Sequence, residues 1–132
     1  MQVMPMRIDI DKQVAYWRAS AEEDWDVGRS LVEQGKTRHG LFFLHLALEK
    51  ALKAHVCRAT KDFAPRIHSL RRLSALCGLP ITEANADFMA AFDRYDIAGR
   101  YPDTLGPPPT REEARSRQST AQEVFTWLIR QL

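Results

Sequence analysis

Residues 41–54, LFFLHLALEKALKA, decide the fold of this chain. Apolar side chains lie almost all the way round a helix drawn through the first half of this stretch. A helix of that kind is buried on more than one side. We therefore predict that residues 38–60 form the central helix of a bundle. The second half of this helix turns basic.

Four further helices are predicted around this one. Apolar residues recur every three or four positions over residues 11–34, 68–76, 82–100 and 110–132, as helices require. Gly35 can end the first of these helices, and Thr82 and Thr110 are candidate N-caps. Glu113 completes a capping box with Thr110. The chain is predicted to be all-α, an up-and-down bundle of five helices over residues 11–132, after an irregular lead-in at residues 1–10.

Composition limits the class of protein. Of 132 residues, 45% are hydrophobic and 27% are charged, which is typical of one globular domain. The longest apolar run, residues 41–48, is too short to span a bilayer, and residues 1–13 do not resemble a signal peptide. Two cysteines, Cys57 and Cys77, are too few for a disulfide scaffold. We expect a cytoplasmic protein with reduced thiols and no membrane partner.

The formal net charge of +2 is unevenly distributed. Residues 1–35, 36–75 and 76–132 carry net charges of −3, +7 and −2. A basic middle segment can bind an anion, a nucleic acid or an acidic partner. It can equally be a solvated face or pair with the acidic helices of the same chain or of a second subunit. We favour these structural interpretations over general nucleic-acid binding.

The sequence contains few signs of catalytic or metal-binding chemistry. It has no G-x-S-x-G, no glycine-rich phosphate loop and no Cys-x-x-Cys. His45 and Glu49 share one helix face, but no second pair of ligands accompanies them. We expect neither a metal nor a cofactor.

Two local motifs carry charged residues at helix ends. Residues 65–70, PRIHSL, place Arg66 and His68 at a helix start, where free N–H groups can hold an anion. Alternatively His68 or Ser69 simply caps the helix, which we favour. Residues 100–103, RYPD, place Arg100 in a last helical turn. Arg100 can pair with Asp103 or bind a phosphate with its guanidinium.

Taken together, five pieces of the chain resemble the small prokaryotic HEPN domain proteins. They are AEED at 21–24, ALEKALKA at 47–54 after Phe42, PRIHSL at 65–70, AGRYPD at 98–103 and PTREEA at 109–114. Their order and spacing match over about residues 11–130. The resemblance implies a five-helix domain that forms homodimers. Relatives often accompany a minimal nucleotidyltransferase, can act in toxin–antitoxin pairs, and were named for a proposed nucleotide-binding role.

Many relatives are metal-independent ribonucleases with an R-x(4–6)-H motif. Arg100 matches the arginine of that motif, but no histidine follows it, and His68 is the last histidine of the chain. The resemblance therefore does not bring the ribonuclease activity with it. The chain also departs from relatives at Phe43 and Leu46, where polar residues are more usual.

Three hypotheses follow. The first is a non-catalytic HEPN dimer that binds a nucleotidyltransferase or a nucleotide. Its binding residues would be Lys50, Lys53, Arg66, His68, Arg100, Tyr101 and Asp103. The second is a ribonuclease with a displaced site, in which His68 is the general acid or base and Arg100 stabilises the phosphate; RNA would be its substrate. The third is a structural dimerisation module with tryptophans at its interface.

Overall fold

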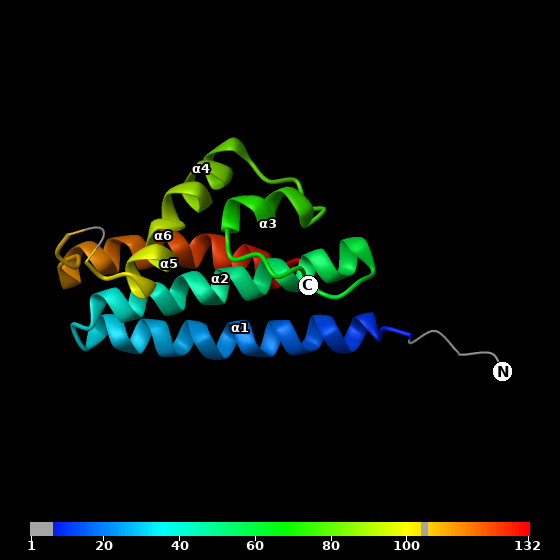
Figure 1. Cartoon of the computed structure of the whole chain (residues 1–132), viewed down its shortest axis with the longest axis horizontal. Helices are drawn as coiled ribbons and strands as arrows, with labels where there is room; N and C mark the ends of the chain where they lie inside the picture. Colours follow the sequence, from blue (N-terminus) through cyan, green and yellow to red (C-terminus); the bar gives the residue numbers. More distant parts are fainter. Residues whose placement is uncertain (1–6, 104–105) are drawn as a thin grey trace.

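The computed structural model describes residues 7–103 and 106–132, and every regular element within them is an α-helix. The helices are α1 (Ile10–Glu33), α2 (Thr37–Thr60), α3 (Leu70–Leu76), α4 (Glu83–Phe92), α5 (Arg94–Arg100) and α6 (Arg111–Arg130) (Figure 1). The predicted all-α class is confirmed. Most of the predicted lead-in, residues 1–6, lies outside the described residues.

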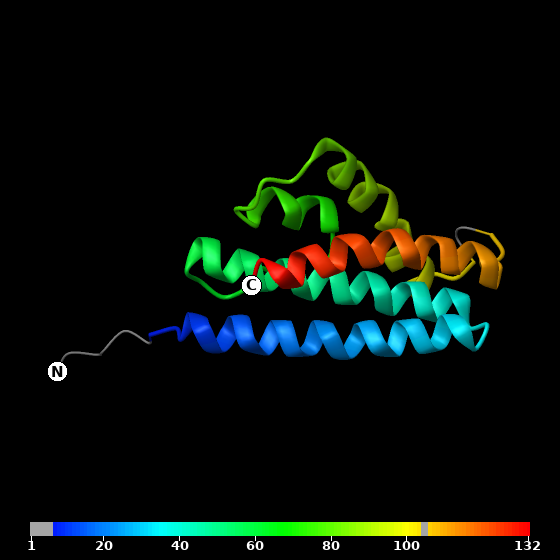
Figure 2. The same cartoon turned by 180° about the vertical axis from the view of Figure 1, so that it is seen from behind.

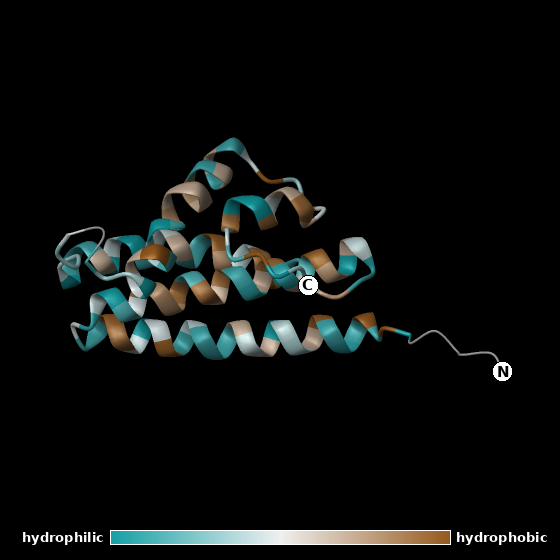
Figure 3. Ribbon diagram, in the orientation of Figure 1, coloured by the Kyte–Doolittle hydropathy of each residue, from teal (hydrophilic) through white to brown (hydrophobic). Residues whose placement is uncertain are grey.

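Helix α2 is the centre of the bundle, as its sequence predicts. It packs against α1, α3, α5 and α6. Leu41, Leu44, Leu48 and Leu52 are all fully buried on it. The long helices α1, α2 and α6 run side by side, and α3 and α4 project together from one side of this layer (Figures 1 and 2). Hydrophobic and hydrophilic residues alternate along each long helix, as amphipathic packing requires (Figure 3).

The expected N-caps at Thr82 and Thr110 form, but among the described residues the Glu113 side chain makes no hydrogen bond back to Thr110 N, so the predicted capping box is only half present. The Thr82 and Thr110 side chains accept hydrogen bonds from the backbone N–H groups of Asn85 and Glu113, both at 3.1 Å. Ser69 caps α3 by accepting from Arg72 N, so this helix begins slightly later than predicted. Gly35 follows the end of α1 with φ of +80°, the left-handed conformation that its role as a helix stop requires.

The predicted helix over residues 82–100 is divided at Asp93 into α4 and α5. Asp96 N bonds to Asp93 O at 3.2 Å, three residues back instead of four, so the regular ladder is interrupted there. The break lets α4 pack on α3 while α5 packs on α2. Helical periodicity runs through the break, which is why the sequence predicts one helix.

Helices α1 and α2 approach each other closely at Gly28 and Gly40. A Cβ atom added to either glycine would lie 2.9 Å from the carbonyl oxygen of the other. Three residues before Gly28, Trp25 of α1 stacks on Phe125 of α6 with ring centroids 4.6 Å apart. No helix among the described residues has both the length and the hydrophobicity needed to cross a bilayer.

Candidate functional site

Helix α2 carries a row of polar side chains inside the bundle. His45, Glu49 and Lys53 are spaced four residues apart, so they share one face of the helix, and they are only 1%, 3% and 6% exposed. Charged groups this deeply buried are costly unless they are paired. The three side chains of this row therefore need polar partners inside the core.

Glu49 lies in the middle of this row and contacts two other side chains. Its Oε2 accepts a hydrogen bond from Lys53 Nζ at 3.0 Å and lies 3.3 Å from His68 Nδ1. His68 comes from the segment before α3, and its side chain remains 54% exposed. A buried carboxylate thus fixes the orientation of a histidine whose ring stays open to solvent.

Asp93, at the break between α4 and α5, joins the row to α3. Its carboxylate accepts from Leu70 N at 2.7 Å and Ser69 Oγ at 3.0 Å, and lies 2.9 Å from His45 Nε2. Burial would raise the pKa of Asp93, but the hydrogen bonds from His45, Leu70 and Ser69 outweigh it and hold the pKa below its ordinary value. Asp93 is therefore a carboxylate that ties α2, α3 and α5 together.

Arg100 lies at the end of α5 on the same side of α2. Its Nε donates to Asp96 Oδ1 at 3.1 Å, and its guanidinium lies 5.7 Å from the centre of the Phe42 ring. The side chain remains 46% exposed. The partner of Arg100 is thus Asp96, one helical turn earlier, and not Asp103 as the sequence suggested. The pair with Asp96 is favoured because both residues lie on one helix, whereas Asp103 would have to approach Arg100 from the following loop.

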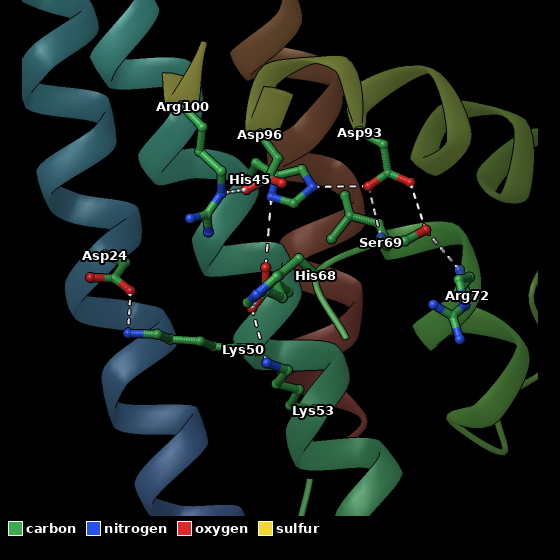
Figure 4. A network of polar contacts seen from close by, with 12 residues as sticks. Asp24, His45, Lys50, Lys53, His68, Ser69, Arg72, Asp93, Asp96 and Arg100 are labelled. Carbon is green, nitrogen blue, oxygen red and sulfur yellow. Dashed lines mark hydrogen bonds and ion pairs between the residues drawn. The ribbon is translucent and has the colours of Figure 1, made fainter. Parts of the chain in front are cut away.

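The carboxylate of Asp96, on α5, lies beside the buried row of α2. One ligand atom from each of His45, Glu49 and Asp96 lies within 4.8 Å of the other two. Arg100 and His68, the two residues proposed for a displaced site, therefore attach to one polar cluster (Figure 4). The cluster consists of His45, Glu49, Lys53, His68, Asp93, Asp96 and Arg100.

The other predicted binding residues lie outside this cluster. Lys50 pairs with Asp24 of α1 at 2.7 Å and donates to Ser20 at 2.7 Å (Figure 4). Arg66, Tyr101 and Asp103 are exposed. Their side chains make no hydrogen bond to any other residue that the structure describes.

A family model described as the HEPN domain matches residues 14–132, which is most of the chain. The chain belongs to the HEPN domain family. Two crystal structures share the fold. TT1696 from Thermus thermophilus is 24% identical, with a TM-score of 0.75 over 91% of this chain and 98% of that one. ST0689, an archaeal HEPN homologue, is also 24% identical, with a TM-score of 0.67 over 89% of this chain and 96% of that one. None of the curated proteins compared with the chain matches it.

Within this HEPN domain, Asp93 and Asp96 are the site residues that sequence reasoning missed. Both lie in a segment that reads as an ordinary amphipathic helix. The available signal was the spacing of Asp96 and Arg100, four residues apart, which favours an ion pair on a helix. Nothing local to Asp93 indicates that it faces His45, because the contact joins distant parts of the chain.

A second feature of this HEPN domain is a hollow between α5, the proline-rich segment and the start of α6. Its volume is about 460 Å³. Three arginines line it, Arg38, Arg94 and Arg117, together with the ring of Tyr95 and the carboxylate of Glu113. This arginine-lined cavity is a different place from the polar cluster, and the sequence gives no sign that its three arginines come together.

Proposed function

We propose that this HEPN domain is a non-catalytic binding protein that holds the phosphate of a nucleotide between Arg100 and His68. The observation that carries the proposal is that both side chains are fixed by carboxylates of one buried cluster while about half of each remains exposed. Fixed, exposed donors bind a ligand without losing much side-chain freedom.

The chemistry of the two side chains suits a phosphate. Arg100 uses Nε for Asp96, so its terminal amino groups remain for two parallel hydrogen bonds to phosphate oxygens. His68 donates in addition whenever it is protonated. Lys50 and Lys53 add positive charge nearby, although Asp24 and Glu49 offset much of it. Binding would therefore depend on a few directed contacts rather than on a general basic surface.

Calorimetric titration with ATP, ADP, AMP and inorganic phosphate tests this proposal. Arg100→Gln and His68→Gln should each weaken binding about 10- to 100-fold, as expected for the loss of a charge-assisted hydrogen bond. Arg130→Gln, an exposed arginine of α6, is the matched control and should bind like the wild type. Equal affinity in all four proteins would contradict the proposal.

A second candidate function is RNA cleavage at the same place. It is favoured by the contact between Glu49 and His68 Nδ1, because a carboxylate that orients one ring nitrogen leaves the other to act as general acid or base. Arg100 would stabilise the charged phosphate. Fluorogenic RNA incubated with wild type and His68→Gln decides between the candidates. Cleavage that disappears in the variant supports the ribonuclease, and an intact substrate removes it.

We also propose the partners that the family suggests: a second copy of the chain, and a minimal nucleotidyltransferase in a toxin–antitoxin pair. Two exposed apolar side chains one helical turn apart support an interface, Ile97 of α5 and Tyr101 directly after it, which are 46% and 63% exposed. The structural dimer hypothesis places tryptophans at the interface, but Trp25 is part of the core. Light scattering at micromolar concentration measures the dimer, and a monomer would also remove the purely structural hypothesis.

Copurification with the product of a neighbouring nucleotidyltransferase gene tests the second partner.

A further inference from the structure

The polar cluster contains two buried atoms that face each other without a hydrogen bond. His45 Nδ1 lies 4.0 Å from Glu49 Oε1. Neither atom has a hydrogen-bond partner among the described residues, and the two side chains are 1% and 3% exposed. At 4.0 Å the two atoms are too far apart to share a proton in an ordinary hydrogen bond. Buried polar atoms without a partner call for an explanation, such as a bound ion.

The other nitrogen of His45 shows which electron pairs point into this gap. Nε2 lies 2.9 Å from the carboxylate of Asp93, and an imidazole nitrogen that faces a carboxylate carries a proton. In the neutral ring, Nδ1 then presents a lone pair toward an oxygen of Glu49. This arrangement, a carboxylate behind the histidine and a free nitrogen in front, is the one that orients histidine ligands of metals.

The balance of acidic and basic side chains in the cluster also favours a bound cation. The cluster contains three acidic side chains, Glu49, Asp93 and Asp96, and two basic ones, Lys53 and Arg100. Each cation takes one carboxylate oxygen, Oε2 of Glu49 and Oδ1 of Asp96, and each of these carboxylates has a second oxygen. The carboxylates of the cluster therefore outnumber its lysine and arginine side chains by one.

We propose that His45, Glu49 and Asp96 bind a first-row divalent cation such as Zn²⁺ or Co²⁺. Their ligand atoms lie within 4.8 Å of one another, and one imidazole nitrogen with two carboxylate oxygens is a donor set that these cations accept. The ion would fill the gap between His45 and Glu49 and link α2 to α5. This inference goes beyond nucleotide binding, since its ligands are not the residues that would hold the phosphate. Glu49 and Asp96 also fix His68 and Arg100, so the metal is tested without nucleotide.

Protein stripped with EDTA and titrated calorimetrically with Zn²⁺ and with Co²⁺, without nucleotide, tests the site. We expect one cation per chain and a higher melting temperature when it is bound. His45→Gln keeps a donor toward Asp93 but lacks Nδ1, and Asp96→Asn keeps an acceptor for Arg100. Each should bind at least about tenfold more weakly. His39→Gln, an exposed histidine of the same helix, should bind like the wild type.

A second measurement keeps the test valid if a variant folds poorly. In wild-type protein, Zn²⁺ should shift the ring ¹⁵N signals of His45 and leave those of His39 and His55 in place. Unchanged His45 signals would overturn the proposal, as would wild-type affinity in His45→Gln. A His45 ring that carries protons on both nitrogens in the stripped protein and does not take up Zn²⁺ would show that a proton, and not a metal, supplies the missing charge.

Discussion

His45 and Glu49 lie one helical turn apart on α2, fully inside the protein, with Nδ1 and Oε1 separated by 4.0 Å and no hydrogen bond between them. On its other sides the same pair is tightly bound, by Asp93 to the histidine and by Lys53 to the glutamate. The gap therefore lies between two groups that are each held by another side chain, the glutamate from within α2 and the histidine from the break between α4 and α5. The stability of the domain should depend on these contacts.

Asp93→Ala should destabilise the domain strongly. It leaves Leu70 N, Ser69 Oγ and His45 Nε2 without their acceptor, and buried donors without partners are costly. We expect the free energy of unfolding to fall by about 2–4 kcal/mol. Urea unfolding followed by circular dichroism measures it. Asp87→Ala, an exposed position of α4, should change it little, and equal values for the two variants would show that Asp93 does not hold the elements together.

Lys53→Met should be destabilising because it leaves the buried carboxyl group of Glu49 without its basic partner. Removal of one partner of a buried pair typically costs about 3–5 kcal/mol. The double variant Lys53→Met, Glu49→Gln removes both charges and should recover part of the loss. A double-mutant cycle from urea unfolding gives the coupling, and strictly additive effects would mean that the contact of 3.0 Å contributes nothing.

Gly40→Ala tests the close approach of α1 and α2. Alanine is the better helix former and by itself would stabilise α2 by about 1 kcal/mol. Its Cβ, however, would lie 2.8 Å from Val32 N and 2.9 Å from Gly28 O, backbone atoms that cannot rotate away. We expect a net loss of about 1–3 kcal/mol, the usual cost of overpacking. An increased melting temperature would show that the two helices can separate freely.

His55 should make stability depend on pH. Burial lowers the pKa of His55 below its ordinary value of 6.5, the charge of Arg58 acts in the same direction, and the hydrogen bond to Leu128 O opposes them only in part. Below pH 6.5 the unfolded chain therefore binds a proton at this ring more readily than the folded chain does. The contribution of His55 is complete above about pH 6.5 and decreases as the pH falls.

His55→Gln isolates this effect. The glutamine amide can still donate to Leu128 O, but it does not titrate. The decrease in unfolding free energy between about pH 7 and pH 5 should be smaller in this variant than in wild type, measured by urea unfolding at each pH. His39→Gln, on the exposed side of α2, should keep the wild-type slope. Identical slopes in all three proteins would mean that His55 titrates normally in the fold.

The helices could be predicted because their signals are local. The nearly continuous apolar surface of residues 41–48 predicts a helix surrounded by others, and α2 is surrounded. Thr82 and Thr110 cap the helices that they precede for the same local reason. The break at Asp93 could not be predicted, because the apolar periodicity continues through it and the contact between Asp93 and the N-terminus of α3 joins distant parts of the sequence.

The candidate site could be predicted only in part. His68 and Arg100 stand out as charged residues at helix ends, and both belong to the polar cluster. Asp96 and Asp93 complete the cluster but resemble any solvated acid on an amphipathic helix. The arginine-lined cavity collects Arg38, Arg94 and Arg117 from three helices, and only the folded chain brings them together.

The most direct test of phosphate binding at the polar cluster is a nitrogen-detected NMR titration with ATP that follows arginine Nε and histidine ring signals together. We predict that Arg100 and His68 shift, and that Arg38, Arg94 and Arg117 of the arginine-lined cavity do not. The reverse result, in which the three cavity arginines shift while Arg100 and His68 stay in place, would contradict the proposed site and move nucleotide binding to the cavity.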